Sequence, residues 1–225
     1  AGGAVIPVTL TVWLWPWGVL LLWPAVSLGL VASAYFGSGP AIFRKYKGRL
    51  HWSARLALAP CLLGQRLSLL YYQRQCRPWD KVTPQVWIGR QLTQTEAASA
   101  ARLGVTAVLD LTAEFCETKP FRSLAYCNIP ILDLTAPSTE QMREMATFIE
   151  EQSGRGVVYI HCKIGYSRTA AAVAAYLLQT GKAHSVPEAL ALLHHLRPAI
   201  VVRREVSSAL SEFAAFLSPR EVASP

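Results

Sequence analysis

The stretch VVYIHCKIGYSRTAAAVAAY, residues 157–176, decides which fold this sequence can adopt. Its opening residues are apolar and mostly β-branched or aromatic, which predicts a buried strand that ends at Cys162. The alanine-rich run behind Arg168 predicts a helix that starts directly after a short loop. A strand, a tight loop and a helix in succession are typical of α/β domains, whose sites form at the carboxyl ends of parallel strands.

The segments around this stretch alternate between strand and helix patterns in the same way. Short apolar runs predict strands at 84–92, 105–111 and 124–131. Caps and helical periodicity predict helices at 93–104, 138–154, 185–197 and 204–217, the third opened by a capping box from Ser185 to Glu188. We therefore predict an α/β domain over residues 80–225, with a central, mostly parallel sheet flanked by helices.

The loop between Cys162 and Arg168 has the composition of a phosphate-binding site. A helix that begins directly after a strand leaves backbone N–H groups unpaired, and the positive end of its dipole adds to their attraction for an anion. Gly165 permits a tight turn, and the guanidinium of Arg168 matches two oxygens of one phosphate. The residues expected to bind the substrate between them are Lys163, Ile164, Gly165, Tyr166 and Ser167.

The same positive environment favours the thiolate form of Cys162. Attack of this sulfur on phosphorus would give a phosphocysteine intermediate and divide hydrolysis into two steps. Thr169 is placed to donate a hydrogen bond to the sulfur, and His161 is expected to orient the loop. The alternative is a buried free cysteine beside an unrelated surface arginine, which explains neither the loop nor the helix behind it.

The segment HCKIGYSRT, residues 161–169, resembles the HC-x5-R-[ST] signature of the cysteine-based protein tyrosine phosphatase superfamily, and the likeness is greatest for its dual-specificity group. The resemblance covers most of residues 80–217 and implies a dual-specificity-phosphatase-like fold. It also implies that Cys162 is the nucleophile, that Arg168 binds phosphate, and that an upstream aspartate acts as the general acid. In NIPILDLTAPS that aspartate is Asp133, while Asp110 is a rival for which we expect a structural role.

The resemblance leaves the substrate open between two classes. We expect proteins that carry phosphotyrosine, phosphoserine or phosphothreonine, with a phospholipid such as phosphatidylglycerophosphate or a phosphoinositide as the alternative. HCKxG, AEFCET at 113–118 and the segment 196–213 are similar to the mitochondrial phosphatase that acts on phosphatidylglycerophosphate. Tyr166, however, replaces the second basic loop residue common in such lipid-directed enzymes. An inactive phosphate-binding module is the alternative of another class, and no cofactor or metal is expected.

The N-terminal third differs sharply in charge from the rest of the chain. Residues 1–43 carry no charged side chain, and the first acidic residue is Asp80. Eight basic residues lie between them and account for the whole net charge of +8, since the remaining 14 basic and 14 acidic residues cancel. Nucleic-acid binding is one interpretation of this basic segment. Basic residues that flank an apolar stretch instead indicate the cytoplasmic side of a membrane span, and we favour this interpretation over nucleic acid.

We therefore predict an integral membrane protein in three parts. Residues 1–43 are expected to form one or two spans, residues 44–79 a basic, amphipathic juxtamembrane region that contacts membrane lipids, and residues 80–225 a cytoplasmic phosphatase domain. A secretory signal peptide fits poorly, because no basic segment precedes the apolar run. The five irregularly spaced cysteines do not suggest a disulfide framework.

Overall fold

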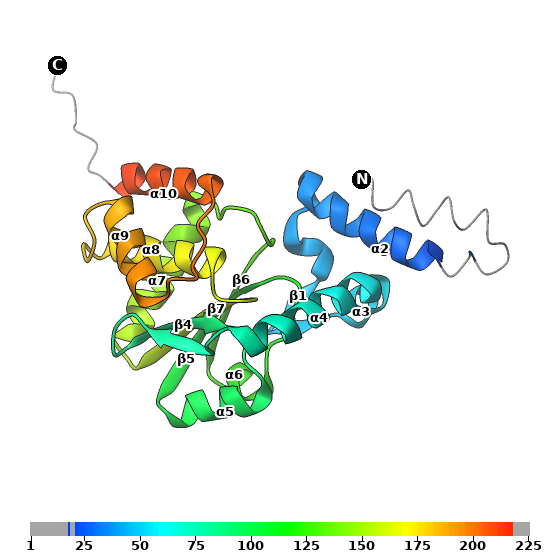
Figure 1. Ribbon diagram of the computed structural model, residues 1–225, viewed down its shortest axis with the longest axis horizontal. Helices are drawn as coiled ribbons and strands as arrows, with labels where there is room; N and C mark the ends of the chain where they lie inside the picture. The colour runs from blue at the N-terminus through cyan, green and yellow to red at the C-terminus, as the bar shows by residue number, and fades with distance from the viewer. Residues whose placement is uncertain (1–17, 19–20, 218–225) are drawn as a thin grey trace, which may run out of the picture.

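A five-stranded sheet in the order β3-β4-β7-β5-β6 forms the centre of the computed structural model, which describes residue 18 and residues 21–217 (Figure 1). The strands are β3 (Trp79–Lys81), β4 (Val86–Arg90), β5 (Val105–Thr112), β6 (Ala125–Ile131) and β7 (Val157–Cys162). β3 pairs with β4 in antiparallel register, whereas β4, β7, β5 and β6 pair in parallel. The predicted α/β fold with a mostly parallel sheet is confirmed.

Helices cover both faces of this sheet (Figure 1). The helices on one face are α7 (Thr139–Ser153), α8 (Ser167–Gln179), α9 (Val186–Leu196) and α10 (Arg204–Leu217), and those on the other are α5 (Gln94–Arg102) and α6 (Lys119–Arg122). Residues 168–177 of α8 are buried without a break. Because half of these residues are alanine, α8 can approach its neighbours closely, and its first turn is held firmly behind the Cys162 loop.

Capping side chains set the starts of the helices much as the sequence predicts. Thr93 and Ser138 form complete capping boxes with Glu96 and Gln141. The box expected at Ser185 forms only in part. The Ser185 hydroxyl accepts the Glu188 N–H, but the Glu188 carboxylate accepts the N–H of His184, at 2.7 Å, in place of that of Ser185.

The N-terminal segment contains one stretch, Leu22–Phe43, that is long and apolar enough to cross a membrane by its length and composition. It comprises α2 (Leu22–Ser33), a π-helical turn (Ala34–Ser38) and a 3₁₀ turn (Gly39–Phe43). This stretch is a candidate for one of the one or two spans expected within residues 1–43, which remain a prediction. Residues 1–17 and 19–20, where a second span would begin, lie outside the described part of the chain.

Two short strands and two helices connect this stretch to the sheet domain. They are the hairpin strands β1 (Lys45–Tyr46) and β2 (Arg49–Leu50), followed by α3 (Trp52–Ala57) and α4 (Ala59–Gln75). The sequence predicts one amphipathic face here, but the apolar side chains of α4 are distributed around its whole circumference. α2 packs along α4, and a small apolar cluster that includes Phe43, Leu58 and Leu132 joins these segments to the sheet domain (Figure 1).

Candidate active site

The loop after β7 is shaped by one glycine and by the start of α8. Gly165 has a φ of +74°, in the left-handed region, and a Cβ atom there would collide with the backbone carbonyl of Gly89. Cys162 ends β7 and α8 begins at Ser167, so four residues turn the chain between them. The backbone N–H groups at the start of α8 consequently lie beside the sulfur, as an anion site requires.

The thiol of Cys162 is buried at the base of this loop. Burial alone raises the pKa of a thiol, but the Arg168 charge and hydrogen bonds from Thr169 and the Tyr166 backbone outweigh it, so the pKa of Cys162 falls below its usual value. The Thr169 side chain is itself buried behind the loop and is one of the groups that lower the pKa of the Cys162 thiol. The arrangement favours a thiolate.

The guanidinium of Arg168 is fixed from several sides although it is almost fully buried. It donates to both carboxylate oxygens of Glu114, at 2.9 and 3.2 Å, and to the backbone carbonyl of Ile131 at 2.9 Å. It also donates to the Asp133 carboxylate at 3.2 Å. Arg168 is thereby held in one orientation beside Cys162, as the sequence led us to expect.

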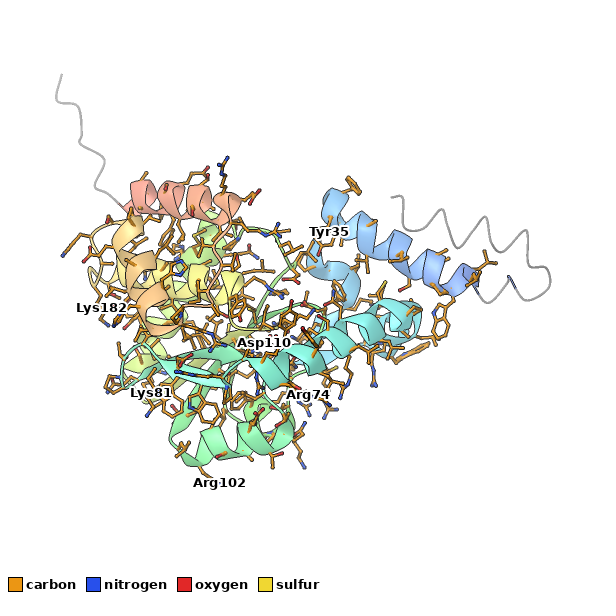
Figure 2. All side chains as sticks on the ribbon, in the orientation of Figure 1. Tyr35, Arg74, Lys81, Arg102, Asp110 and Lys182 are labelled. Atoms are coloured by element: carbon orange, nitrogen blue, oxygen red, sulfur yellow. The ribbon has the colours of Figure 1, made fainter. Side chains whose placement is uncertain are left out.

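Asp133 lies in the loop that follows β6, and its side chain is 36% exposed. Its contact with Arg168 brings it to the same end of the sheet as Cys162, because β6 and β7 both run toward this edge in the parallel sheet. Tyr35, from the turn after α2, donates its hydroxyl to the Asp133 backbone carbonyl at 3.0 Å (Figure 2 labels Tyr35). The loop is therefore attached to the N-terminal segment.

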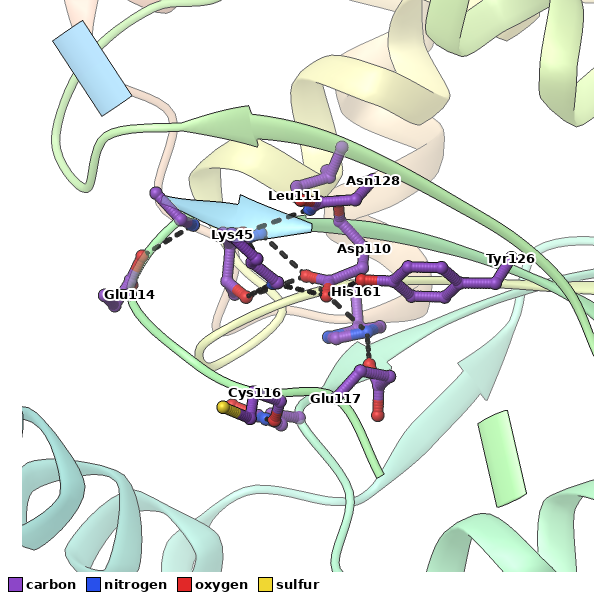
Figure 3. A network of polar contacts seen from close by, with 12 residues as sticks. Lys45, Asp110, Leu111, Glu114, Cys116, Glu117, Tyr126, Asn128 and His161 are labelled. Atoms are coloured by element: carbon purple, nitrogen blue, oxygen red, sulfur yellow. Dashed lines mark hydrogen bonds and ion pairs between the residues drawn. The ribbon is translucent and has the colours of Figure 1, made fainter. Parts of the chain in front are cut away.

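His161 belongs to a buried ionic network beneath the loop (Figure 3). Its Nε2 lies 2.7 Å from the Glu117 carboxylate and 4.0 Å from that of Asp110, and its Nδ1 lies 3.2 Å from the Cys162 carbonyl. Burial lowers the pKa of His161, but the two carboxylates prevail and raise it to about 9. The imidazole is thus cationic at neutral pH, which suits a group that positions the loop and not a general base.

Asp110 receives further donors in this network, including the N–H and the hydroxyl of Thr112 at 2.8 and 2.7 Å. The ammonium group of Lys45, in β1, lies 2.6 Å from Asp110, and the hydroxyl of Tyr126 donates to the same carboxylate at 2.7 Å (Figure 3). Burial raises the pKa of Asp110, but Lys45 and His161 lower it overall. Asp110 therefore acts within the structural network, as expected, while Asp133 faces Arg168.

Asp110, Glu117 and His161 also have the composition of a metal site, since their ligand atoms lie within 4.8 Å of one another. No spacing pattern in the sequence indicates this cluster. Two cations, Lys45 and protonated His161, already balance its two carboxylates. These residues therefore fit an ionic network better than a metal centre, which needs a neutral imidazole.

The remaining loop residues point in several directions. Lys163 donates to the side-chain oxygen of Gln65, in α4, at 2.6 Å. The Tyr166 hydroxyl contacts the Cys76 sulfur at 3.2 Å, and the Ile164 carbonyl accepts from Arg197 at 3.2 Å. The Ser167 hydroxyl is buried without a hydrogen-bond partner in the described chain. Lys163 and Tyr166, predicted to bind substrate, are thus engaged with the juxtamembrane segment in this structure.

A groove of about 490 Å³ runs from Lys163 between α2 and α4. Its walls are mostly apolar and are formed by Pro24, Leu28, Val31, Pro60, Cys61, Gly64, Gln65, Ser68 and Lys163. A smaller hollow beside it shares Val31, Cys61 and Gln65 and reaches Asp133. The apolar N-terminal helices consequently line the approach to the predicted catalytic residues.

Known proteins with similar sequences and structures include several phosphatases. Phosphatidylglycerophosphate phosphatase PTPMT2 of Arabidopsis thaliana is 26% identical over 172 residues, which span 73% of this chain and 75% of that protein. Human phosphatidylglycerophosphatase and protein-tyrosine phosphatase 1 is 29% identical over 179 residues, spanning 71% and 85%. The crystal structure of Tk-PTP in its active form is 28% identical with a TM-score of 0.57, covering 61% of this chain and 97% of that one.

The family model for the dual specificity phosphatase catalytic domain matches residues 86–216, which include β4 to β7, the Cys162 loop and Asp133. This match takes in more than half of the chain. The protein belongs to the dual specificity phosphatase family.

Proposed function

We propose that this protein is a membrane-anchored, cysteine-dependent phosphatase that removes a phosphomonoester group from a phospholipid. Its membership of the dual specificity phosphatase family makes it a phosphatase of the cysteine-dependent class. The observation that carries the choice of substrate is the apolar groove that leads from Lys163 between α2 and α4.

In the first step, the Cys162 thiolate attacks phosphorus while the bond to the leaving oxygen breaks, and Asp133 supplies a proton to that oxygen. Arg168 binds two of the phosphoryl oxygens. An arriving phosphoryl dianion would replace Asp133 as a hydrogen-bond acceptor of Arg168. The two hydrogen bonds from Arg168 to Glu114 would meanwhile keep the guanidinium in place. Asp133 would then be free to face the leaving group.

In the second step, the Asp133 carboxylate takes a proton from water, which attacks the phosphocysteine and releases inorganic phosphate with the Cys162 thiolate. Thr169 stabilises this departing thiolate through its hydroxyl. The proton given up in the first step is thereby recovered, and each residue returns to its starting state.

A phospholipid suits the surroundings of this site. Its phosphate would lie over the Cys162 loop, Lys163 would contact the headgroup, and an acyl chain would follow the groove along Leu28 and Val31. The Arabidopsis and human relatives are both named as phosphatases of phosphatidylglycerophosphate, which supports the same class. A substrate embedded in the bilayer also meets a tethered enzyme at high effective concentration.

Phosphoproteins, which the sequence alone placed first, remain the second candidate. The human relative is named as a protein-tyrosine phosphatase as well as a lipid phosphatase. A phosphopeptide would have no acyl chain to place in the apolar groove between α2 and α4. For this reason we rank the lipid first.

We further propose that the apolar N-terminal segment, which includes Leu22–Phe43, anchors the protein in the membrane and that the sheet domain lies on the cytoplasmic side. The length and composition of this stretch support a span. Eight basic residues follow between Arg44 and Arg77, and no acidic residue accompanies them before Asp80. Such an excess of basic residues marks the cytoplasmic flank of a span.

The test compares substrates on the full chain in detergent micelles. We expect turnover of phosphatidylglycerophosphate or a phosphoinositide to exceed that of a phosphotyrosine peptide, and Cys162→Ser to abolish both. Leu28→Trp fills the groove and should lower kcat/KM for the lipid by about tenfold or more, with little effect on p-nitrophenyl phosphate. Leu30→Trp, on the same helix but outside the groove, is the matched control. Turnover of peptide alone would refute the lipid assignment, and no turnover of any substrate would leave the inactive phosphate-binding module.

A further inference from the structure

Another hollow, of about 650 Å³, is lined along one wall by Glu114, Phe115, Cys116 and Glu117. Arginines from four separate elements line it: Arg49 of β2, Arg55 of α3, Arg66 of α4 and Arg122 of α6. We call these four residues and the space between them the arginine pocket. Neither Cys162 nor Lys163 lines it, so it is distinct from the groove that serves the predicted active site.

The charges of the arginine pocket are unbalanced. Within residues 21–217, none of its four guanidiniums forms an ion pair or a side-chain hydrogen bond. Arg122 shows this most clearly, since its Nε is buried and has no partner in that range. The two carboxylates in the wall, Glu114 and Glu117, are already paired with Arg168 and His161. The pocket therefore presents uncompensated positive charge to an anion.

The lining also indicates which kind of anion would bind. Leu50, Trp52, Leu62, Leu63 and Phe115 provide apolar walls between the arginines. Trp52 is 70% exposed, and exposed tryptophan is typical of the interface between a membrane and water. α3 and α4 both pack against α2, the first part of the candidate span. Positive charge beside apolar walls near a span suits an anionic headgroup that is still attached to its acyl chains.

We propose that the arginine pocket binds the headgroup of an anionic phospholipid that is not hydrolysed. Each guanidinium can give two parallel hydrogen bonds to a phosphate, and the apolar walls receive the glycerol and the upper acyl carbons. The bound lipid fixes α4 at the bilayer surface. Because α4 also supplies Gln65 to Lys163, the same contact holds the groove of the predicted active site toward the membrane. This proposal rests on the membrane placement proposed above and not on the identity of the substrate.

The test is lipid binding by native mass spectrometry of the full chain released from detergent. The probes are dioleoylphosphatidylglycerol and dioleoylphosphatidylcholine, which share their acyl chains, so a difference in affinity reports the headgroup alone. We expect phosphatidylglycerol to bind at least about tenfold more tightly, since each arginine near anionic lipid contributes about a fivefold gain. Excess inorganic phosphate should not displace it, because the apolar walls favour a lipid over the free ion.

Matched variants distinguish the pocket from general surface charge. Arg49→Gln/Arg55→Gln/Arg66→Gln should reduce the preference for phosphatidylglycerol to about fivefold or less, which is the contribution of the remaining Arg122. Arg74→Gln/Arg102→Gln/Arg204→Gln removes the same charge from exposed sites outside the pocket and should retain the preference. If the first triple variant does not fold, two single variants on α4 replace it. Arg66→Glu changes the pocket and should lower the preference, whereas Arg74→Glu changes an exposed position outside the pocket and should not.

If a pocket variant and its matched control lost the preference for phosphatidylglycerol equally, the lipid would be attracted by general surface charge and the proposal would be overturned. An unchanged preference in the pocket variants would overturn it as well. Displacement by inorganic phosphate would also overturn the lipid assignment. None of these readouts depends on hydrolysis, so failure of the proposed enzymatic reaction would be seen separately.

Discussion

Opposing influences act on the single sulfur of Cys162. Burial favours the neutral thiol, while Arg168 and the hydrogen bonds from Thr169 and the loop backbone favour the thiolate. The residues that produce this balance could be predicted from sequence, because Cys162, Arg168 and Thr169 are neighbours in one loop. The partners that fix Arg168 could not be predicted in this way, since Glu114 lies 54 residues away along the chain.

Thr169→Val tests the hydroxyl without changing the size of the side chain greatly. Loss of a hydrogen bond to a charged sulfur should raise the pKa of Cys162, so less thiolate is present at a given acidic pH. In the pH profile of kcat/KM for p-nitrophenyl phosphate, we expect the acidic limb to shift to higher pH by about one unit. Thr169→Ser keeps the hydroxyl and should leave the limb in place, and an unmoved limb in the valine variant would argue against this contact.

Elements were predicted well where the signal is local. The capping residues Thr93 and Ser138 and the alternation of strand and helix depend on a few neighbouring residues, and the corresponding helices begin where the sequence indicates. The hairpin β1–β2 was not predicted, because each of its strands has two residues and no periodicity to detect. Its effect on the domain comes from Lys45, which contacts Asp110 65 residues further along the chain.

Lys45→Met measures the energetic role of this hairpin. The side chains of Lys45 and Asp110 are 2% and 1% exposed, so the variant leaves a buried carboxylate without its main counter-ion. We expect a loss of about 3–5 kcal/mol in the free energy of unfolding at neutral pH, measured by urea denaturation in detergent. Lys47→Met, at an exposed position of the same turn, should change it by about 0.5 kcal/mol or less.

The pH dependence of this difference follows from the lowered pKa of Asp110. A carboxyl whose pKa is lower in the folded state stabilises the protein above its unfolded pKa, and this contribution disappears as pH falls through the folded value. The gap between wild type and Lys45→Met should therefore narrow in acid. A gap that is constant with pH would mean that Lys45 contributes through packing and not through charge.

The whole molecule is held together by contacts that no local pattern reveals. Tyr35 to Asp133 and Gln65 to Lys163 each join positions 98 residues apart, and both lead from the N-terminal helices to the predicted active site. The sequence indicated a tether followed by a separate phosphatase domain. The structure shows in addition that the N-terminal segment contributes side chains to the core and to the approach of the site.

A chain that begins at residue 78 would lose Lys45, Gln65 and Tyr35 together. We expect Asp110→Asn to have opposite effects in the two contexts. In the full chain it breaks the ion pair with Lys45 and should destabilise by about 2 kcal/mol or more. In the shortened chain it removes an uncompensated buried charge and should stabilise or be neutral. Urea denaturation is measured for the full and the shortened chain, each with and without Asp110→Asn. If the substitution lowered the free energy of unfolding by a similar amount in both chains, the role assigned to Lys45 would be contradicted.

The central claim is that the Cys162 sulfur forms a covalent bond to phosphorus. The most direct measurement is rapid acid quench of Asp133→Asn with p-nitrophenyl phosphate, whose phenolate leaves without a proton from Asp133, followed by mass spectrometry of the peptide that contains Cys162. The variant keeps the nucleophile but lacks the carboxylate that activates water, so we predict that one phosphoryl group accumulates on Cys162. A peptide that remains unmodified while substrate is consumed, or a phosphoryl group on another residue, would contradict the account.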